Sequence, residues 1–289
     1  MPELPEVETL RRDLEASIVG RRIEAVAVTG ARTVRRYGLA SGSGPGAVLA
    51  SGLEGRVVVG VGRRGKYLLC HLGGGDVWVV HLGMSGQLLL ARSTLDVEAP
   101  HTHVRVSFFD GAELRFVDPR TFGECWVTRV GGDGGGGGDG VPELAHLGFE
   151  PLDEALNPSR LADALARTRR ALKPLLCEQR FIAGIGNIYS DEILHAARLR
   201  WDRPGSSLVH AEVCRLHASI VEILTAAIDA RGSSLADSQY RDLEGQVGGY
   251  QLAHRVYARE GRPCLVCGTP IVRIRVAGRS SFFCPRCQA

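Results

Sequence analysis

Four cysteines near the end of the chain have the spacing of a metal site. Cys264 and Cys267 form one C-x2-C pair, Cys284 and Cys287 form another, and 16 residues separate the pairs. Two such pairs let four thiolates surround one Zn²⁺ tetrahedrally, and a full thiolate shell makes the metal structural and not catalytic. Two disulfides are the alternative, but the acidic N-terminus MPELPEVE lacks the apolar core of a secretory signal. We predict one structural zinc ion that supplies most of the folding free energy of this small module.

The N-terminus places an amine beside carboxylates. Removal of Met1 would expose the secondary amine of Pro2. An α-amine has a pKa of about 8, so a useful fraction is neutral near pH 7. A helix start just after it lowers that pKa further. Glu3 lies next to this amine and is a candidate general acid or base, while Glu6 lies one helical turn further on. The alternative is ordinary enrichment of glutamate at a helix start and a small residue after the initiator.

Charge is unevenly distributed along the chain. The net charge of all 289 residues is only +3, which by itself demands no nucleic-acid partner. The last 35 residues carry seven arginines against one glutamate, a net charge of +6, and the other 254 residues therefore carry −3. A compact basic module on a nearly neutral body is a favourable surface for phosphate. A solvated basic tail is the alternative.

The remaining composition describes a globular protein. Hydrophobic residues make up 44% of the chain and charged residues 23%. No apolar run reaches the ~18 residues that a membrane span needs. We expect the other four cysteines to be reduced core thiols of a cytoplasmic protein; they are Cys70, Cys125, Cys177 and Cys214.

The first half of the chain reads as one helix followed by strands. Residues 5–18 place Val7, Leu10, Leu14 and Ile18 on one helical face, with Pro5 in the first turn and Gly20 as a stop. From 21 to 128 the pattern is typical of strands. Segments 56–72 and 77–90 flank a Gly-Gly-Gly-Asp turn, and 104–109 and 112–117 flank an Asp-Gly turn. Strands of this number predict a β-sandwich or barrel.

The second half is predicted to be helical. Residues 131–140 contain eight Gly and two Asp, which is typical of a flexible linker or loop and the clearest domain boundary. Asn157-Pro158 opens a helix that includes Leu161, Leu165 and Leu172, a second helix begins near Asn187, and a third spans about 210–231. Residues 245–251 are predicted to be a mobile loop, and the zinc segment closes the chain.

Six motifs occur in an order that resembles the formamidopyrimidine-DNA glycosylase family of bacterial base-excision repair enzymes. They are MPELPEVE at the start, RRGKYLL at 63–69, HLGMSG at 81–86, DPRTFG at 118–123, GIGNIYSDEIL at 184–194, and the four-cysteine segment ending in GRSSFFCPRCQ. The resemblance covers nearly the whole chain. It implies an α+β multidomain fold: an N-terminal helix and β-sandwich at 2–130, a helix–two-turn–helix domain at 141–240, and a zinc finger at 252–289.

The resemblance also implies catalytic roles. Pro2 is the nucleophile: its amine attacks the anomeric carbon of a nucleotide, displaces the base and leaves an iminium ion that permits strand cleavage by elimination. Glu3 is the general acid or base, and Glu6 is a supporting residue. Lys66 and Arg279 contact phosphates and assist the two eliminations. Without the resemblance, Lys66 would be read as part of a solvated basic turn.

DNA contacts follow from the same resemblance. Met84, Arg120 and Phe122 match three residues that fill the space left by an extruded base and hold the opposite strand; alternatively, Met84 and Phe122 are core residues. Further DNA contacts are implied for His101, Lys173 and Asn187, of which Asn187 follows a glycine loop at a helix start suited to phosphate. His101 has a structural role as its alternative. Thr168 replaces a lysine of the family, and we assign no contact to it or to the adjacent Arg167 and Arg169.

Together these features predict a bifunctional enzyme, a DNA glycosylase and abasic-site lyase that removes oxidised purines. Its expected partner is double-stranded DNA with oxidised bases, on which it acts as a cytoplasmic monomer without contact to a membrane. Two alternatives remain at this point. One is an endonuclease VIII-type enzyme for oxidised pyrimidines, against which Leu4 and Phe122 speak. The other is a zinc-containing DNA-binding protein without catalysis, although Pro2, Glu3 and Lys66 are all present.

Overall fold

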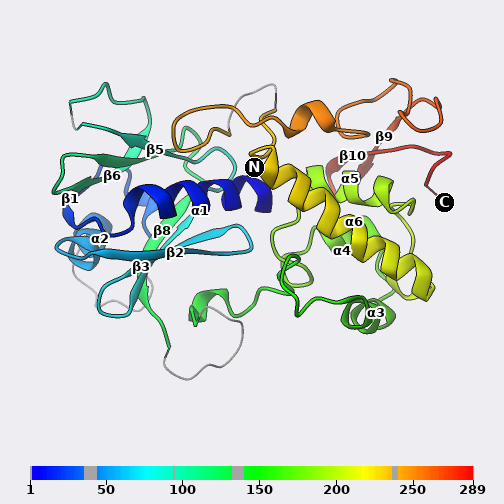
Figure 1. The fold of residues 1–289 in the computed structure, drawn as a ribbon, viewed down its shortest axis with the longest axis horizontal. Helices are drawn as coiled ribbons and strands as arrows, with labels where there is room; N and C mark the ends of the chain where they lie inside the picture. The colour runs from blue at the N-terminus through cyan, green and yellow to red at the C-terminus, as the bar shows by residue number, and fades with distance from the viewer. Residues whose placement is uncertain (1, 36–43, 94, 132–139, 236–239, 289) are drawn as a thin grey trace. The chain divides into compact units, whose positions relative to one another are not determined.

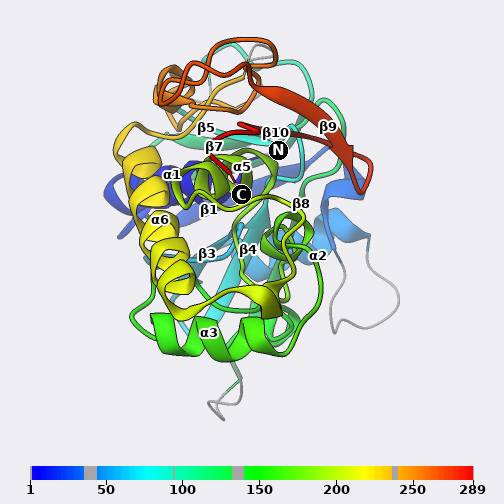
Figure 2. The same cartoon turned by 90° about the vertical axis from the view of Figure 1, so that its right-hand side faces the viewer.

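The computed structural model describes residues 2–35, 44–93, 95–131, 140–235 and 240–288 (Figures 1 and 2). The chain forms two compact units. The first comprises Met1–Ala145 and Arg231–Gly249, and the second His146–Ala230 and Tyr250–Ala289. None of the helices in the described ranges is both long enough and apolar enough to cross a membrane.

The first unit begins with helix α1 (Leu4–Ile18), as predicted. Pro5 lies in its first turn, where its missing N–H costs no helical hydrogen bond. One face carries Leu10, Leu14 and Ile18, which are completely buried. Burying this face stabilises the helix, because isolated helices of this length are marginal in water. The burial of this face thereby fixes α1 to the body of the unit.

Two four-stranded antiparallel sheets follow, which confirms the predicted sandwich. One has the strand order β1-β6-β7-β5 and the other β2-β3-β4-β8. Their bounds are β1 Ile23–Val28, β2 Val58–Arg64, β3 Tyr67–Leu72, β4 Asp76–His81, β5 Gln87–Ala91, β6 Thr102–Phe108, β7 Glu113–Val117 and β8 Glu124–Arg129. The predicted Asp-Gly hairpin joins β6 to β7, which pair antiparallel.

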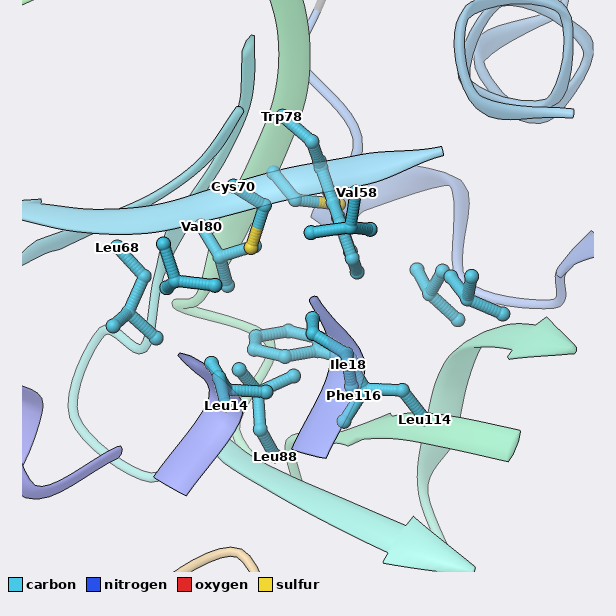
Figure 3. Close-up of a cluster of buried hydrophobic side chains, with 14 of the residues drawn as sticks. Leu14, Ile18, Val58, Leu68, Cys70, Trp78, Val80, Leu88, Leu114 and Phe116 are labelled. Carbon is cyan, nitrogen blue, oxygen red and sulfur yellow. The ribbon is translucent and has the colours of Figure 1, made fainter. Parts of the chain in front are cut away.

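The core of this unit lies between the two sheets and α1 (Figure 3). One sheet contributes Val58, Leu68, Cys70, Trp78 and Val80, the other contributes Leu88, Leu114 and Phe116, and α1 contributes Leu14 and Ile18. Side chains of alternate strand positions point inward from both sheets, as expected for aligned sandwiches. The sandwich therefore supports the loops at its strand ends, which carry the predicted site residues.

Several local predictions were wrong. Residues within 45–53 form a helix, α2 (Pro45–Leu53), where strands were expected. The helix opened by Pro158 ends at Ala166, and Leu172 instead begins a separate short helix. Cys70 and Cys125 are core thiols whose pKa burial raises to about 12. Cys177 and Cys214 are only half-buried, so the prediction that they are core residues fails.

The second unit is helical, as predicted. It contains α3 (Pro158–Ala166), α4 (Leu172–Leu176), α5 (Asn187–Ala196) and α6 (His210–Asp229). The side chain of Asn157 accepts a hydrogen bond from the Arg160 N–H and caps α3, which confirms the predicted cap. Helix α6 packs against both α3 and α5 (Figure 2). Short 3-10 turns complete the two units at Ala31–Thr33, Pro142–Leu144, Gly205–Ser207 and Tyr250–Ala253.

The C-terminal segment forms a hairpin of β9 (Val272–Val276) and β10 (Arg279–Phe283). Glu192 of α5 attaches the segment before it: its carboxylate accepts hydrogen bonds from three successive backbone N–H groups, those of residues 255–257. In the glycine-rich stretch, residues 132–139 lie outside the described part of the chain. Its two ends meet, because the Gly131 N–H donates to the Gly140 carbonyl at 2.9 Å.

Candidate active site and metal centre

The start of α1 holds the predicted nucleophile and both carboxylates in a buried position. Pro2, Glu3 and Glu6 are all buried. The Glu6 carboxylate accepts a hydrogen bond from the Glu3 N–H at 2.7 Å and another from the Ser233 N–H at 2.7 Å. Each oxygen of Glu6 therefore binds one backbone amide, and the residue next to Pro2 is held at a fixed position. Gly232 permits this contact, since a Cβ there would lie 2.8 Å from Glu6 Cγ.

The segment that supplies Ser233 is itself fixed to the first unit. Arg231 forms ion pairs with Asp13 at 2.5 Å and with Asp242 at 2.7 Å, and these raise the pKa of its guanidinium. Tyr240 donates a hydrogen bond to the Glu6 carbonyl at 3.5 Å, and burial, followed by the Glu6 charge, raises the pKa of its phenol. The helix predicted at about 210–231 ends just before Gly232, but the sequence indicated nothing about Ser233.

Lys66 lies in the tight turn between β2 and β3. Gly65 has a positive φ of 55°, which a two-residue hairpin turn requires. The Lys66 side chain is 5% exposed. His81 stacks on Tyr67 with 4.6 Å between ring centroids. Burial, and next the charge of Lys66, lower the pKa of His81 to about 4, so its imidazole is neutral at pH 7. His81 begins the HLGMSG motif, but nothing in its residue type or spacing indicated this buried neutral state.

Asp118 joins the two loops that carry the predicted wedge residues. Its carboxylate accepts hydrogen bonds from the Ser85 hydroxyl at 2.5 Å and from the Gly123 N–H at 2.7 Å. The loops also touch directly, because a Cβ on Gly83 would lie 2.4 Å from the carbonyl carbon of Phe122. Neither Asp118 nor Ser85 was singled out from the sequence, although both lie in quoted motifs.

The joined loops present the predicted wedge residues together. Phe122 is 52% exposed, which rules out the alternative that it is a core residue, and Met84 is half-buried. Arg120 is exposed, and its guanidinium carbon lies 5.3 Å from the centroid of the Phe122 ring. His101 is exposed as well, and its backbone carbonyl accepts a hydrogen bond from the Asp118 N–H at 3.0 Å. All four predicted residues therefore belong to one connected group of loops.

In the second unit, three predicted residues line one cavity of about 270 Å³. They are Lys173, Asn187 and Arg279, which come from α4, α5 and β10. The Asn187 side-chain amide donates to the Ser280 carbonyl at 2.9 Å. The Lys173 ammonium is buried and donates to the Asn187 carbonyl at 2.9 Å and to the Asp191 carboxylate at 2.7 Å. Arg279 is exposed at the start of its strand.

The glycine loop before α5 is held by Gln179, which the sequence reasoning missed. Its amide accepts from the Gly184 N–H at 2.8 Å and donates to the Ile185 carbonyl at 2.8 Å. Gly184 needs its positive φ of 91° for this turn. Near Thr168, Arg170 is the arginine that lines the cavity, and it forms an ion pair with Glu178. Arg167 and Arg169 are not among the residues that line it.

The four predicted cysteines come together as one metal site. Their sulfur atoms all lie within 4.8 Å of one another, with 3.8 Å between Cys264 and Cys287 and 3.4 Å between Cys267 and Cys284. A tetrahedral zinc site with Zn–S bonds of about 2.3 Å separates its sulfurs by about 3.8 Å. The arrangement thus fits zinc. His195 of α5 supports it from outside, with its Nε2 3.5 Å from the Cys264 sulfur.

Three family models match the chain in succession. Residues 1–125 match the formamidopyrimidine-DNA glycosylase N-terminal domain, 147–239 the H2TH domain of the same enzymes, and 261–289 the zinc finger found in FPG and IleRS. The chain combines a β-sandwich, whose first helix follows buried Pro2 and Glu3, with an H2TH domain and a four-cysteine finger. This combination defines a class of zinc-finger DNA repair glycosylases. Within that class, the chain belongs to the formamidopyrimidine-DNA glycosylase family.

Curated relatives and solved structures are similar to this chain along nearly its full length. The formamidopyrimidine-DNA glycosylase of Pelotomaculum thermopropionicum is 41% identical and covers 100% of this chain and 99% of its own. The MutM (Fpg) structure from Thermus thermophilus has a TM-score of 0.85, 41% identity, and coverage of 99% and 98%. The Lactococcus lactis Fpg complex with N7-benzyl-Fapy-dG DNA has a TM-score of 0.85, 35% identity, and coverage of 99% for both chains. The predicted enzyme class, glycosylase and abasic-site lyase, is that of this family.

Proposed function

We propose that the chain excises oxidised purines, such as 8-oxoguanine and formamidopyrimidines, from duplex DNA and then cleaves the strand by β,δ-elimination. The observation that carries this proposal is the buried start of α1, where Glu6 fixes the Glu3 N–H directly after Pro2. A relative from Lactococcus lactis supports the substrate class, because it was solved with DNA containing N7-benzyl-Fapy-dG and with DNA containing an abasic site.

In the first step, the amine of Pro2, exposed after removal of Met1, forms a bond to the anomeric carbon of the damaged nucleotide. The bond between that carbon and the base breaks, and the base leaves with a proton supplied by an acid such as Glu3. Pro2 then loses its N–H proton, and the bond between the anomeric carbon and the ring oxygen breaks as that oxygen takes up a proton. The product is an iminium ion between Pro2 and the opened sugar. Glu6 contributes by holding the backbone of Glu3, because a nucleophile works fastest in a fixed near-attack geometry.

In the second step, the iminium acts as an electron sink. A base removes the acidified proton from the neighbouring sugar carbon, and the 3′ phosphate leaves with the electrons of its C–O bond. A base then removes the proton of the sugar carbon next to the one that carries the 5′ phosphate, and this phosphate leaves with the electrons of its C–O bond. Hydrolysis of the iminium restores the amine of Pro2. We assign Lys66 and Arg279 to the phosphates, since cations stabilise the negative charge of a departing phosphate.

Extrusion of the damaged base leaves a space in the duplex. Met84 and Phe122 are the residues that enter this space, and Arg120 binds the orphaned base on the opposite strand. The half-exposed Phe122 ring and the shared anchor at Asp118 support this assignment, because an inserted side chain needs both access and a rigid base. His101 and Asn187 are assigned to the DNA backbone.

Zinc fits the four cysteines and would hold the finger in its folded form, while the chemistry is assigned to the protein's own residues. Because basic residues concentrate in this finger, it supplies local electrostatic attraction to DNA, although the net charge of the whole chain is only +3. We further propose that the protein acts as a cytoplasmic monomer, as assigned from the sequence.

Borohydride trapping tests the proposal directly. Incubation with a duplex that contains 8-oxoguanine opposite cytosine should give a covalent complex after reduction, with the adduct on residue 2 by peptide mapping. Pro2→Gly should reduce its yield sharply, and an uncleaved N-terminal tag should permit DNA binding without cutting. An adduct on a lysine would overturn the mechanism. Faster release of thymine glycol than of 8-oxoguanine would overturn the substrate assignment.

A further inference from the structure

Lys173, which lines the cavity in the second unit, belongs to a buried ion pair that the reaction described above does not use. Lys173 of α4 and Asp191 of α5 are 3% and 1% exposed, and 2.7 Å separates Nζ from Oδ1. Because a buried charge is costly unless it is paired, each of these two groups depends on the other. The positive charge of Lys173 is therefore neutralised inside the protein.

Asp191 also binds the finger strand. Its carboxylate accepts hydrogen bonds from the Ser281 hydroxyl at 2.8 Å and from the Phe282 N–H at 3.0 Å. The neighbouring residue Ser280 binds Asn187 through its carbonyl. Three consecutive residues of β10 are thus attached to the first turns of α5, one to three positions after Arg279, where the strand begins.

Lys173 connects α4 to the same part of α5. Its ammonium donates to the backbone carbonyl of Asn187 as well as to Asp191, so one side chain connects α4 with two positions of α5. An ammonium group has three N–H donors, and these two contacts fix its direction. Without Lys173, the Asp191 carboxylate would be an unpaired negative charge one helical turn from Asn187, which lines the cavity together with Arg279, and it would disfavour an anion there.

We propose that Lys173 and Asp191 form a positioning pair that sets Arg279 and Asn187 at the phosphate-binding cavity, and that Lys173 is not itself a phosphate ligand. This inference rests on the proposed function, because it takes the ligand of the cavity to be a DNA phosphate. The pair carries no net charge, so its effect on DNA binding is geometric. It replaces the direct DNA contact that the sequence predicted for Lys173.

The double variant Lys173→Met/Asp191→Asn separates the two roles. It removes both charges together and leaves the net charge unchanged. Binding to a duplex with a tetrahydrofuran abasic analogue is measured at several salt concentrations for this variant, both single variants and the wild type. We expect each single variant to bind at least about tenfold more weakly, and the double variant to return within about threefold of wild type with the same salt dependence, as a buried pair requires.

A direct phosphate contact gives a different result. Losing one phosphate contact lowers the slope of log K against log salt concentration by about 0.9. A double variant that binds at least about tenfold more weakly than the wild type and shows this lower slope would overturn the proposal. The comparison needs only the double variant and the wild type, so misfolding of a single variant does not prevent it. Unfolding temperature and zinc content confirm that the double variant is folded.

A second measurement does not depend on replacing the pair. Ser281→Ala removes one hydrogen bond between Asp191 and β10. If Asp191 acts through Arg279, this change should weaken DNA binding several-fold in the wild type but not in an Arg279→Ala background. Equal effects in both backgrounds would contradict the proposal. Borohydride trapping at residue 2 distinguishes failure of this inference from failure of the proposed function. If trapping persists while these binding tests give the contrary results, only the proposal of a positioning pair is wrong.

Discussion

The Glu6 carboxylate accepts a hydrogen bond from the backbone N–H of Glu3 at 2.7 Å, within one turn of the same helix. Its second oxygen binds the N–H of Ser233, which is 227 residues away in the chain. The carboxylate of Glu6 thereby connects the residue beside the proposed nucleophile to the segment that follows α6. Two predictions about Glu6 follow from this double contact, one kinetic and one thermodynamic.

Glu6→Gln should slow excision strongly, because one amide oxygen can accept from only one side while the NH₂ group faces an N–H donor. A displacement of about 1 Å at a reacting group costs roughly 100-fold in rate. Single-turnover excision of 8-oxoguanine measures the effect, and the free energy of unfolding should fall by about 1.5–3 kcal/mol. Glu15→Gln, in the same helix but half exposed, is the control. Equal single-turnover rates for the two variants would show that the contact is without kinetic importance.

The sequence predicted the helix of Glu6 well but not its partner. Helix α1 was found because Leu10, Leu14 and Ile18 repeat at helical spacing and are buried on one face. The contact to Ser233 joins positions far apart in the chain, and no local pattern encodes such a pairing. The same holds for the Lys173–Asp191 pair, whose members lie on two helices. Periodicity identifies elements, whereas their mutual contacts depend on the tertiary fold.

Helix α2 was missed for a different physical reason. Its sequence contains Gly46 and Gly52, which disfavour helix. Both glycines are needed because the helix lies close to strands: a Cβ on Gly46 would lie 3.1 Å from Val28, and one on Gly52 would lie 3.0 Å from Val127. Close packing against the strands stabilises this helix although its two glycines have low helix propensity. The four-cysteine cluster was predicted completely, since its members lie in two short motifs whose spacing is itself the signal.

Loss of the Asp118 anchor should impair base extrusion. Asp118→Asn replaces one acceptor oxygen with a donor, so either Ser85 or Gly123 loses its partner, at a cost of about 1–3 kcal/mol in stability. The loop that carries Met84 and the loop that carries Arg120 and Phe122 should then no longer be held at a fixed position relative to each other. The rise in 2-aminopurine fluorescence beside a lesion, which reports insertion into the stack, should become slower.

Phe122→Ala should reduce the same fluorescence change more strongly, because the inserted ring itself is removed. Phe109→Ala is a matched control, since Phe109 is also a surface phenylalanine of this unit, 64% exposed in the turn after β6. A wild-type fluorescence response from Phe122→Ala, or an equal loss from Phe109→Ala, would show that Phe122 does not act as a wedge residue.

Stability should fall in mild acid because His81 is buried in its neutral form. Its pKa is about 4 in the folded protein, below the ordinary value of 6.5, owing to burial first and the charge of Lys66 second. The unfolded chain therefore binds a proton at a higher pH than the folded one, and stability present above pH 6.5 is lost as the pH falls toward 4. From pH 7 to pH 5 this group alone accounts for about 2 kcal/mol.

His81→Phe should remove that part of the pH dependence while keeping a ring against Tyr67. Urea unfolding at pH 7 and pH 5 gives the two free energies for each protein, and their difference should be about 2 kcal/mol smaller in the variant. The exposed His101→Phe serves as the control, with the pH dependence of the wild type. A difference unchanged in His81→Phe would mean that this histidine is not the group responsible.

Zinc retention should depend on His195 as well as on the four cysteines. The purified protein should contain one zinc per chain by elemental analysis, and Cys264→Ser should lose most of it, because a three-thiolate site is open. His195 contacts the Cys264 sulfur at 3.5 Å, and groups that hydrogen-bond to metal ligands typically change metal affinity by roughly tenfold or more. His195→Phe should therefore release zinc to a chromogenic chelator at about tenfold lower chelator concentration, whereas the exposed His210→Phe should match the wild type. Retention in His195→Phe equal to that of the wild type would show that the thiolates alone determine the affinity.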